Sequence, residues 1–163
     1  MTTRIERSLV YETVFEFMAD YCINALPTPL DLACRALDID LVCLTQLKAR
    51  GMHEEDLFAL WGNQDGSVSV SVDHIRGRTA ARIYYNDYVP QERQRFTIAE
   101  EITHYLLGHY VDERCNVLSP EFDEEFYRHC DEQARIGAGL ILCPPAIFYE
   151  VPEYNNPADV ARL

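Results

Sequence analysis

The chain has 163 residues, of which 48% are hydrophobic, and it carries a formal charge of −13. This length and apolar content predict a single domain with a substantial core and argue against a disordered protein. Nucleic-acid binding through phosphate neutralisation needs clustered Lys and Arg, so an acidic chain is not expected to bind DNA or RNA directly. We interpret the charge as that of a solvated acidic surface.

The location of the protein is predicted from its start and its cysteines. The opening MTTRIERSLV has no cationic segment leading into a long apolar run, and no later stretch approaches the ~18 apolar residues of a membrane span. We therefore expect a soluble, cytoplasmic protein that makes no contact with a membrane. Reduced thiols are expected at all six cysteines, which are widely spaced without a C-x-x-C pair: Cys22, Cys34, Cys43, Cys115, Cys130 and Cys143.

The first part of the chain predicts two helices and a strand. Apolar residues near helical spacing over residues 4–25 indicate an amphipathic helix. Pro27 and Pro29 end it, and Thr28 is expected to cap a second short helix that runs to Ala36. Residues 39–44 then predict a short strand, and residues 54–61 predict one or two further helical turns.

The middle of the chain predicts a β-hairpin. Val68, Val70 and Val72 alternate with serines, which is the period of a half-exposed strand. The stretch 80–85 is its expected partner, and His74 in the intervening turn is interpreted as a solvated loop residue. Together with the helices, these strands predict an α+β fold with a small antiparallel sheet of about three strands.

The stretch RQRFTIAEEITHYLLGH, residues 93–109, carries the chemistry. Its apolar residues recur at helical spacing after Pro90 and stop near Gly108. Glu100 and His104 share the inward stripe one turn apart, and Glu101 lies about 100° round. Charge on a buried stripe costs several kcal/mol unless a cation compensates it. The alternative is an exposed acidic patch beside a core histidine.

A second long helix is predicted from Glu121 to Leu142, opened by Pro120. Its small residues, including Ala134 and Gly137, lie on one side and predict close packing against another helix. Asp131 lies one turn before Ala134, so it is the carboxylate expected to meet Glu100 and His104. On this helix Cys130 and Cys143 would be about 20 Å apart, too far for a disulfide.

These blocks resemble the ImmA/IrrE family of metallopeptidases, which are often encoded near phage-type repressors. IYYNDYVPQERQRFTIAEEITHYLLGH is close to the family pattern around H-E-x-x-H, and DEQARIGAGLILCPP is similar to its E-x-x-A-x-x-F-A-x-x-L-L-x-P helix. The resemblance implies a helical, zincin-like fold and one metallopeptidase-like domain over residues 1–163. It also implies a C-terminal helical region, of which NNPADVARL would form only the first turns.

The resemblance assigns roles to four residues. His104 matches the second metal histidine, Glu101 the catalytic glutamate, and Asp131 the downstream acidic ligand, where Glu is usual. Glu100 stands where the family has its first histidine. A site of Glu100, His104 and Asp131 would offer two oxygens and one nitrogen, which zinc accepts and which also suits manganese or iron. The departures from the family pattern also allow a site that binds metal weakly or not at all.

The implied activity is metal-dependent cleavage of a peptide bond in a helix-turn-helix repressor encoded nearby. Glu101 would act as the general base, and the metal would polarise the scissile carbonyl. A substrate strand could pair with the hairpin. The alternative is a regulatory binding module of the same fold that does not cut its partner. His109 and His129 are interpreted as surface or capping residues rather than ligands.

Overall fold

The structure is a computed structural model that describes residues 7–21, 23, 25–53, 56, 65–73, 78–116 and 119–145. Within these residues it confirms an α+β fold, with the following elements: α1 (Arg7–Asp20), α2 (Leu30–Ala36), β1 (Ile39–Cys43), α3 (Leu44–Ala49), β2 (Gly66–Asp73), β3 (Arg78–Tyr85), α5 (Gln91–Leu106), the 3-10 turns η1 (His109–Val111) and η2 (Glu113–Cys115), and α6 (Glu124–Leu142). Among the helices so described, none is both long enough and apolar enough to cross a membrane.

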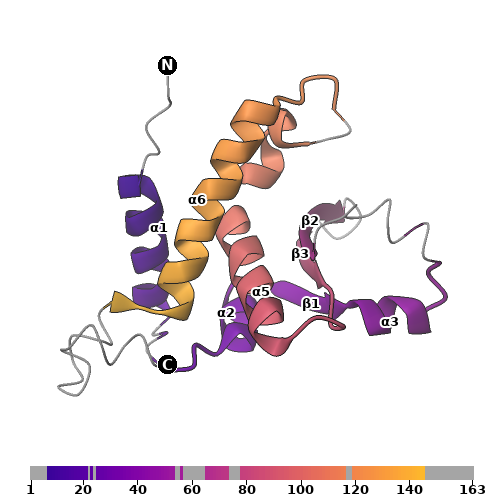
Figure 1. The fold of residues 1–163 in the computed structure, drawn as a ribbon, viewed down its shortest axis with the longest axis horizontal. Helices are drawn as coiled ribbons and strands as arrows, with labels where there is room; N and C mark the ends of the chain where they lie inside the picture. The colour runs from indigo at the N-terminus through magenta and orange to yellow at the C-terminus, as the bar shows by residue number, and fades with distance from the viewer. Residues whose placement is uncertain are drawn as a thin grey trace.

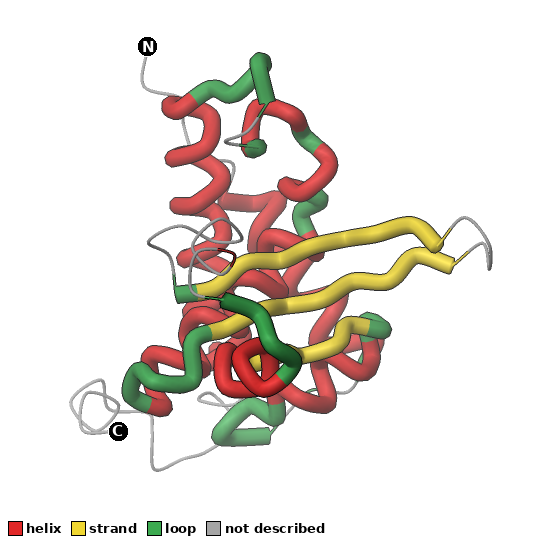
Figure 2. Tube along the Cα trace, turned by 90° about the vertical axis from the view of Figure 1, so that its right-hand side faces the viewer, coloured by secondary structure: helices red, strands yellow, loops and turns green. Residues whose placement is uncertain are grey.

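The sheet has three strands in the order β1-β3-β2. Strands β2 and β3 form the predicted antiparallel hairpin, with Val68 opposite Ile83, and the hairpin projects from the helices in Figure 2. The expectation of a purely antiparallel sheet was wrong, because β1 pairs with β3 in parallel, with Leu41 opposite Ile83. Between β1 and β3 the chain passes through α3 and β2. This long connection lets β3 run in the same direction as β1, which a parallel pair requires.

Helix α5 lies between α6 and the sheet, and α1 packs on the far side of α6 (Figure 1). The core between these layers is built from branched aliphatic side chains that are fully buried, among them Val10, Ile83, Ile102 and Ile141. Helices α1, α2, α5 and α6 and the three strands contribute to this core, whereas α3 packs in a smaller cluster around Val42 and Leu47. Packing around this core fixes the position of α5 relative to α6, the two long helices that carry the candidate site residues.

The small residues of α6 allow α5 to approach closely, as the sequence predicts. Ala134, Gly137 and Ala138 are buried against α5. A Cβ added at Gly137 would lie 2.7 Å from the hydroxyl oxygen of Thr103. That hydroxyl donates a hydrogen bond to the carbonyl of Ala99, 2.9 Å away. The contact fixes the spacing of the two helices at the level of the candidate site.

Three predicted helix boundaries need correction or confirmation. Helix α6 begins at Glu124 rather than Glu121, because the Asp123 side chain accepts hydrogen bonds from the backbone N–H groups of residues 125 and 126. Thr28 does not cap α2; its hydroxyl instead donates to the carbonyl of Ile141 at 2.6 Å. Helix α5 follows Pro90 as predicted, and Gly108, with φ of 70°, lies just past its end.

Several predictions fall on residues that the structure does not describe. They concern the helical turns at 54–61, apart from Asp56, the turn that contains His74, and the segment 146–163 with its implied C-terminal helix. The short helix α3 was not predicted. Its first turn is joined to β1 without a loop, and the Gln46 side chain accepts a hydrogen bond from the backbone N–H of Cys43.

Candidate functional site

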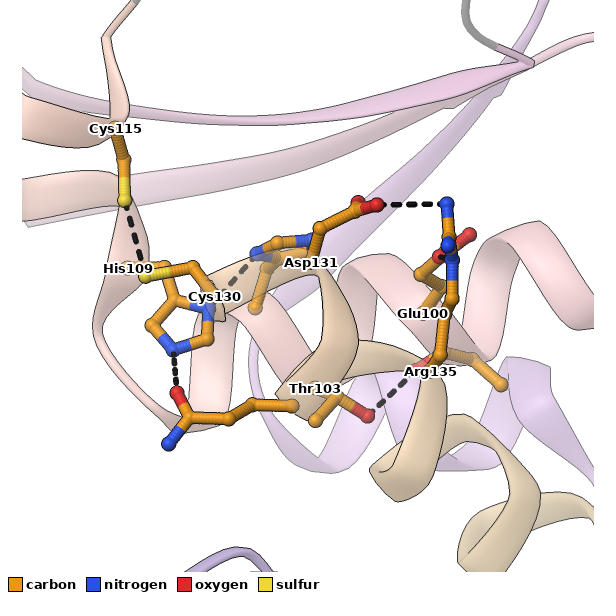
Figure 3. Close-up of polar contacts among 10 residues, drawn as sticks. Glu100, Thr103, His109, Cys115, Cys130, Asp131 and Arg135 are labelled. Carbon is orange, nitrogen blue, oxygen red and sulfur yellow. Dashed lines mark hydrogen bonds and ion pairs between the residues drawn. The ribbon is translucent and has the colours of Figure 1, made fainter. Parts of the chain in front are cut away.

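The candidate site lies where α5 and α6 face each other. Helix α5 contributes Glu100, Glu101 and His104, and α6 contributes Asp131 and Arg135. Figure 3 shows Asp131 joined by a dashed line to the Arg135 guanidinium, with Glu100 beside the same side chain. The helical periods read from the sequence account for this meeting, because each carboxylate lies on the stripe that faces the other helix.

A first group of side chains, the carboxylate–guanidinium cluster, consists of Glu100, Asp131 and Arg135. The Arg135 guanidinium lies 3.3 Å from Glu100 Oε1 through Nε and 2.7 Å from Asp131 Oδ2 through Nη2. The Arg135 side chain is 61% exposed, whereas that of Glu100 is only 13% exposed. Burial raises the pKa of Glu100, the charge of Asp131 raises it further, and Arg135 opposes both.

A second group, the histidine chain, consists of His104, His109 and Gln133. His104 Nδ1 lies 2.9 Å from His109 Nδ1, and His109 Nε2 lies 3.1 Å from Gln133 Oε1. His109 and Gln133 are both buried. The interpretation of His109 as a surface residue was therefore wrong. It assumed that the helix face continues beyond Gly108, whereas the chain turns there and directs His109 back toward α6.

His104 connects the two groups. Its Nε2 atom lies 4.0 Å from Asp131 Oδ1, while its Nδ1 atom faces the histidine chain. Burial, followed by the positive charges that His109 and Arg135 can carry, lowers the pKa of His104 to about 3. The imidazole is therefore neutral at ordinary pH, which is the form of histidine that binds a metal ion.

Glu101 lies beneath strand β2 and is 9% exposed. Burial first and the charge of Glu100 second raise its pKa to about 8, while a hydrogen bond from the backbone N–H of Val68 lowers it. A Cβ added at Gly66 would lie 3.5 Å from Glu101 Cγ, so the carboxyl group sits against the backbone of β2. This strand is at one edge of the described sheet.

The predicted absence of a disulfide between Cys130 and Cys143 is confirmed. Both are free, as are the other cysteines of the described part of the chain, Cys34, Cys43 and Cys115. Cys130 precedes Asp131 on α6, and its sulfur lies 3.2 Å from that of Cys115 as a thiol hydrogen bond. Cys22 falls outside the described residues.

The family of the chain follows from a comparison with known protein families. Residues 62–161 match the IrrE N-terminal-like domain, Peptidase_M78. The chain belongs to this family. The match covers β2, β3, α5, η1 and α6, which together hold every candidate site residue, and it begins after α3. As a member of a peptidase family, the IrrE-like protein is metallopeptidase-like and is related to enzymes that act on proteins. None of the curated proteins matches the chain.

The donor groups of this IrrE-like site fit a divalent cation chemically, although they are not arranged around one point. In the part of the chain that the structure describes, no three His, Cys, Asp or Glu side chains are placed to share an ion. The 4.0 Å between His104 Nε2 and Asp131 Oδ1 is within the reach of two bonds of ~2.0–2.2 Å to one metal. Glu100 is held apart by Arg135, whose guanidinium is the cation that both carboxylates contact.

Proposed function

We propose that this protein is a metal-dependent endopeptidase. The observation that carries the proposal is the burial of Glu101 beneath an edge strand, on the same helix as Glu100 and His104 and opposite Asp131. A buried carboxyl with a raised pKa, next to two other carboxylates and a neutral imidazole, is typical of a catalytic site rather than of a structural ion pair. Membership of a peptidase family supports the same activity.

Each site residue has a role in the proposed reaction. Glu100, His104 and Asp131 would hold the ion, with zinc expected from the family and manganese or iron also suited to two oxygens and one nitrogen. The bound ion would act as a Lewis acid toward the scissile carbonyl and the attacking water. Glu101 would take a proton from that water and deliver it to the leaving amine. A cation nearby favours the ionised form of Glu101 that this step needs.

The substrate is proposed to bind as an added strand along β2. This strand pairs with β3 on one side and forms an edge of the described sheet on the other. An extended peptide on that edge would form backbone hydrogen bonds that do not depend on its sequence. Since Glu101 accepts a hydrogen bond from the backbone N–H of Val68 on this strand, a peptide bound along the edge would lie close to the proposed base.

We further propose that the substrate is a helix-turn-helix repressor encoded nearby and that cleavage takes place in the cytoplasm. The support is the resemblance of the two motif blocks to the ImmA/IrrE metallopeptidases. The formal charge of −13 is consistent with an enzyme that acts on the repressor protein rather than on its DNA site. The free cysteines of the described residues suit a reducing compartment.

The test is cleavage of the purified repressor by the wild type and by Glu101→Gln, with zinc and manganese supplied separately. The substitution keeps the size and hydrogen bonding of the side chain but removes the base. We expect it to lower the cleavage rate by at least ~100-fold while leaving the metal content, measured by elemental analysis, nearly unchanged. Equal cleavage by the two proteins would remove Glu101 from the mechanism.

The second candidate is a regulatory module that binds the repressor without cutting it. It is favoured by the Arg135 guanidinium, which joins Glu100 and Asp131 where the family mechanism needs a metal. An internal cation would compensate the buried charge permanently. Intact repressor in the presence of either metal, together with tight binding by chelator-treated protein in titration calorimetry, would establish this candidate and reject the peptidase.

A further inference from the structure

We infer that His109 and Gln133 are positioning residues that fix the tautomer of His104 and leave its Nε2 atom free for a cation. Neither residue is among the four to which the family resemblance assigns a role. The tautomer itself follows from the hydrogen bonds of the folded chain. Its consequence for metal binding rests on the proposed function.

The tautomer follows from the one acceptor at the end of the histidine chain. Gln133 Oε1 is a carbonyl oxygen and can only accept, so the His109 Nε2 atom 3.1 Å away must carry the hydrogen. A neutral imidazole has one N–H group, which leaves His109 Nδ1 as an acceptor. His104 Nδ1, 2.9 Å from it, must then be the donor. His104 Nε2 then carries no hydrogen and keeps its lone pair.

Another acceptor lies near that lone pair. Asp131 Oδ1 lies 4.0 Å from His104 Nε2, too far for a hydrogen bond, and both atoms are acceptors when His104 has the tautomer inferred here. The opposite tautomer would place an N–H group toward Asp131 and withdraw the nitrogen from any metal. The histidine chain therefore selects the form of His104 that can act as a ligand, as hydrogen-bond partners behind metal-bound histidines do.

The fold holds the two positioning residues rigidly. Gly108, with φ of 70°, turns the chain after α5 so that His109 enters the space beside α6. Gln133 follows Asp131 by two residues on α6 and is 6% exposed. An imidazole and an amide enclosed in this way have few alternative partners. Their hydrogen bonds are accordingly expected to persist in the metal-free protein.

The experiment measures the tautomer and the metal affinity separately. Nitrogen chemical shifts of the His104 ring, recorded by NMR on chelator-treated full-length protein, report which ring nitrogen carries the hydrogen. Gln133→Met removes the acceptor at similar side-chain length, and Gln133→Glu keeps an acceptor oxygen for His109. The matched control is His129→Gln, since His129 lines the same cavity as His109 and Gln133 but is not in the hydrogen-bond chain. Zinc affinity is measured by competition with a chromogenic chelator.

We expect the hydrogen on His104 Nδ1 in the wild type, in Gln133→Glu and in the His129→Gln control. In Gln133→Met the Nε2–H form should become populated, and zinc should bind about 10- to 100-fold more weakly. A wild-type His104 with its hydrogen on Nε2, or a Gln133→Met protein with unchanged tautomer, would overturn the inference. If the wild type has the expected tautomer and none of the proteins binds zinc, the inference about the tautomer stands and the proposed metallopeptidase function fails.

Discussion

The carboxylate–guanidinium cluster and the histidine chain meet at His104, yet they differ in charge and in contact with solvent. The cluster is ionic, and its Arg135 side chain is 61% exposed. The histidine chain is neutral, and His109 and Gln133 are buried. Exposed ion pairs contribute little to stability and exchange partners readily, whereas buried polar groups keep their hydrogen bonds because an unpaired one is costly. The carboxylate–guanidinium cluster is therefore the exchangeable side of the site, because its carboxylates can change partners. The histidine chain is the fixed side.

This difference matters for any ion that enters the site. The guanidinium of Arg135 can swing into solvent and release two carboxylates without disturbing the core. The imidazole of His104 is held from behind and cannot turn without breaking the bond to His109. A cation entering the site would thus displace the exposed guanidinium of Arg135 and bind the imidazole of His104. The following predictions test this contrast between an exchangeable and a fixed side.

The largest effect is expected from Glu101, which is buried like the histidine chain but bears a carboxyl group. Its pKa is about 8 when folded, against 4.5 for the free side chain. Between these values the unfolded chain releases the proton and the folded protein keeps it. The stability that is present below pH 4.5 is therefore lost as the pH rises, until the loss is complete above pH 8. The loss should be on the order of 3 to 5 kcal/mol.

Glu101→Gln cannot ionise and should escape this loss. Urea unfolding of chelator-treated protein at acidic and mildly alkaline pH would show the variant more stable than the wild type at the higher pH. Glu100→Gln is the matched control, because Arg135 opposes the rise in the pKa of Glu100 and the benefit there should be smaller. Parallel pH profiles for wild type and Glu101→Gln would show that Glu101 is ionised in the folded protein.

The second-largest effect on stability is expected at the contact between α5 and α6, which positions both the carboxylate–guanidinium cluster and the histidine chain. In Gly137→Ala, the new methyl group would collide with the Thr103 side chain, which is fully buried and hydrogen-bonded to its own helix. Overpacking of this kind costs about 1–3 kcal/mol. The gain in helix propensity, about 1 kcal/mol, offsets part of it. We expect a net destabilisation of about 1–2 kcal/mol in thermal or urea unfolding.

Gly139→Ala on the same helix is the control, because a Cβ at Gly139 would meet nothing within 4 Å. Only the propensity gain applies there, so this variant should be more stable than the wild type by up to about 1 kcal/mol. If the two alanine variants were equally stable, the close contact between α5 and α6 would not be what sets the helix spacing.

The smallest effect on stability is expected from Arg135→Ala, on the exchangeable side. The Arg135 side chain is 61% exposed, so solvent screens its ion pairs, and losing the guanidinium should change the free energy of unfolding by only about 1 kcal/mol. Zinc affinity, in contrast, should rise, because the internal cation no longer competes for Glu100 and Asp131. Arg128→Ala, at an exposed position on the same helix, should leave both quantities unchanged. Unaltered zinc binding in Arg135→Ala would show that the guanidinium does not compete with a metal.

Much of the fold was predictable because it depends on local patterns. The alternation of Val68 and Val70 with serines identified β2, and the period of α5 put Glu100 and His104 on one stripe. Small residues on α6 predicted its close contact with α5, which Gly137 confirms. Each of these features depends on the repeat of a helix or strand, and a repeat can be read from the order of residues alone.

The remaining features depend on contacts between segments that are distant in the chain. The direction of β1 depends on how the chain returns to β3, and no local pattern encodes that path. The partners of His109 lie on two different helices, and a turn at Gly108 decides where its ring points. The sequence by itself predicted that Glu100, Glu101, His104 and Asp131 form the candidate site. Only the tertiary structure decided that Arg135 supplies the cation on one side and that Gln133 orients the histidines on the other, because both depend on how α5 and α6 face each other.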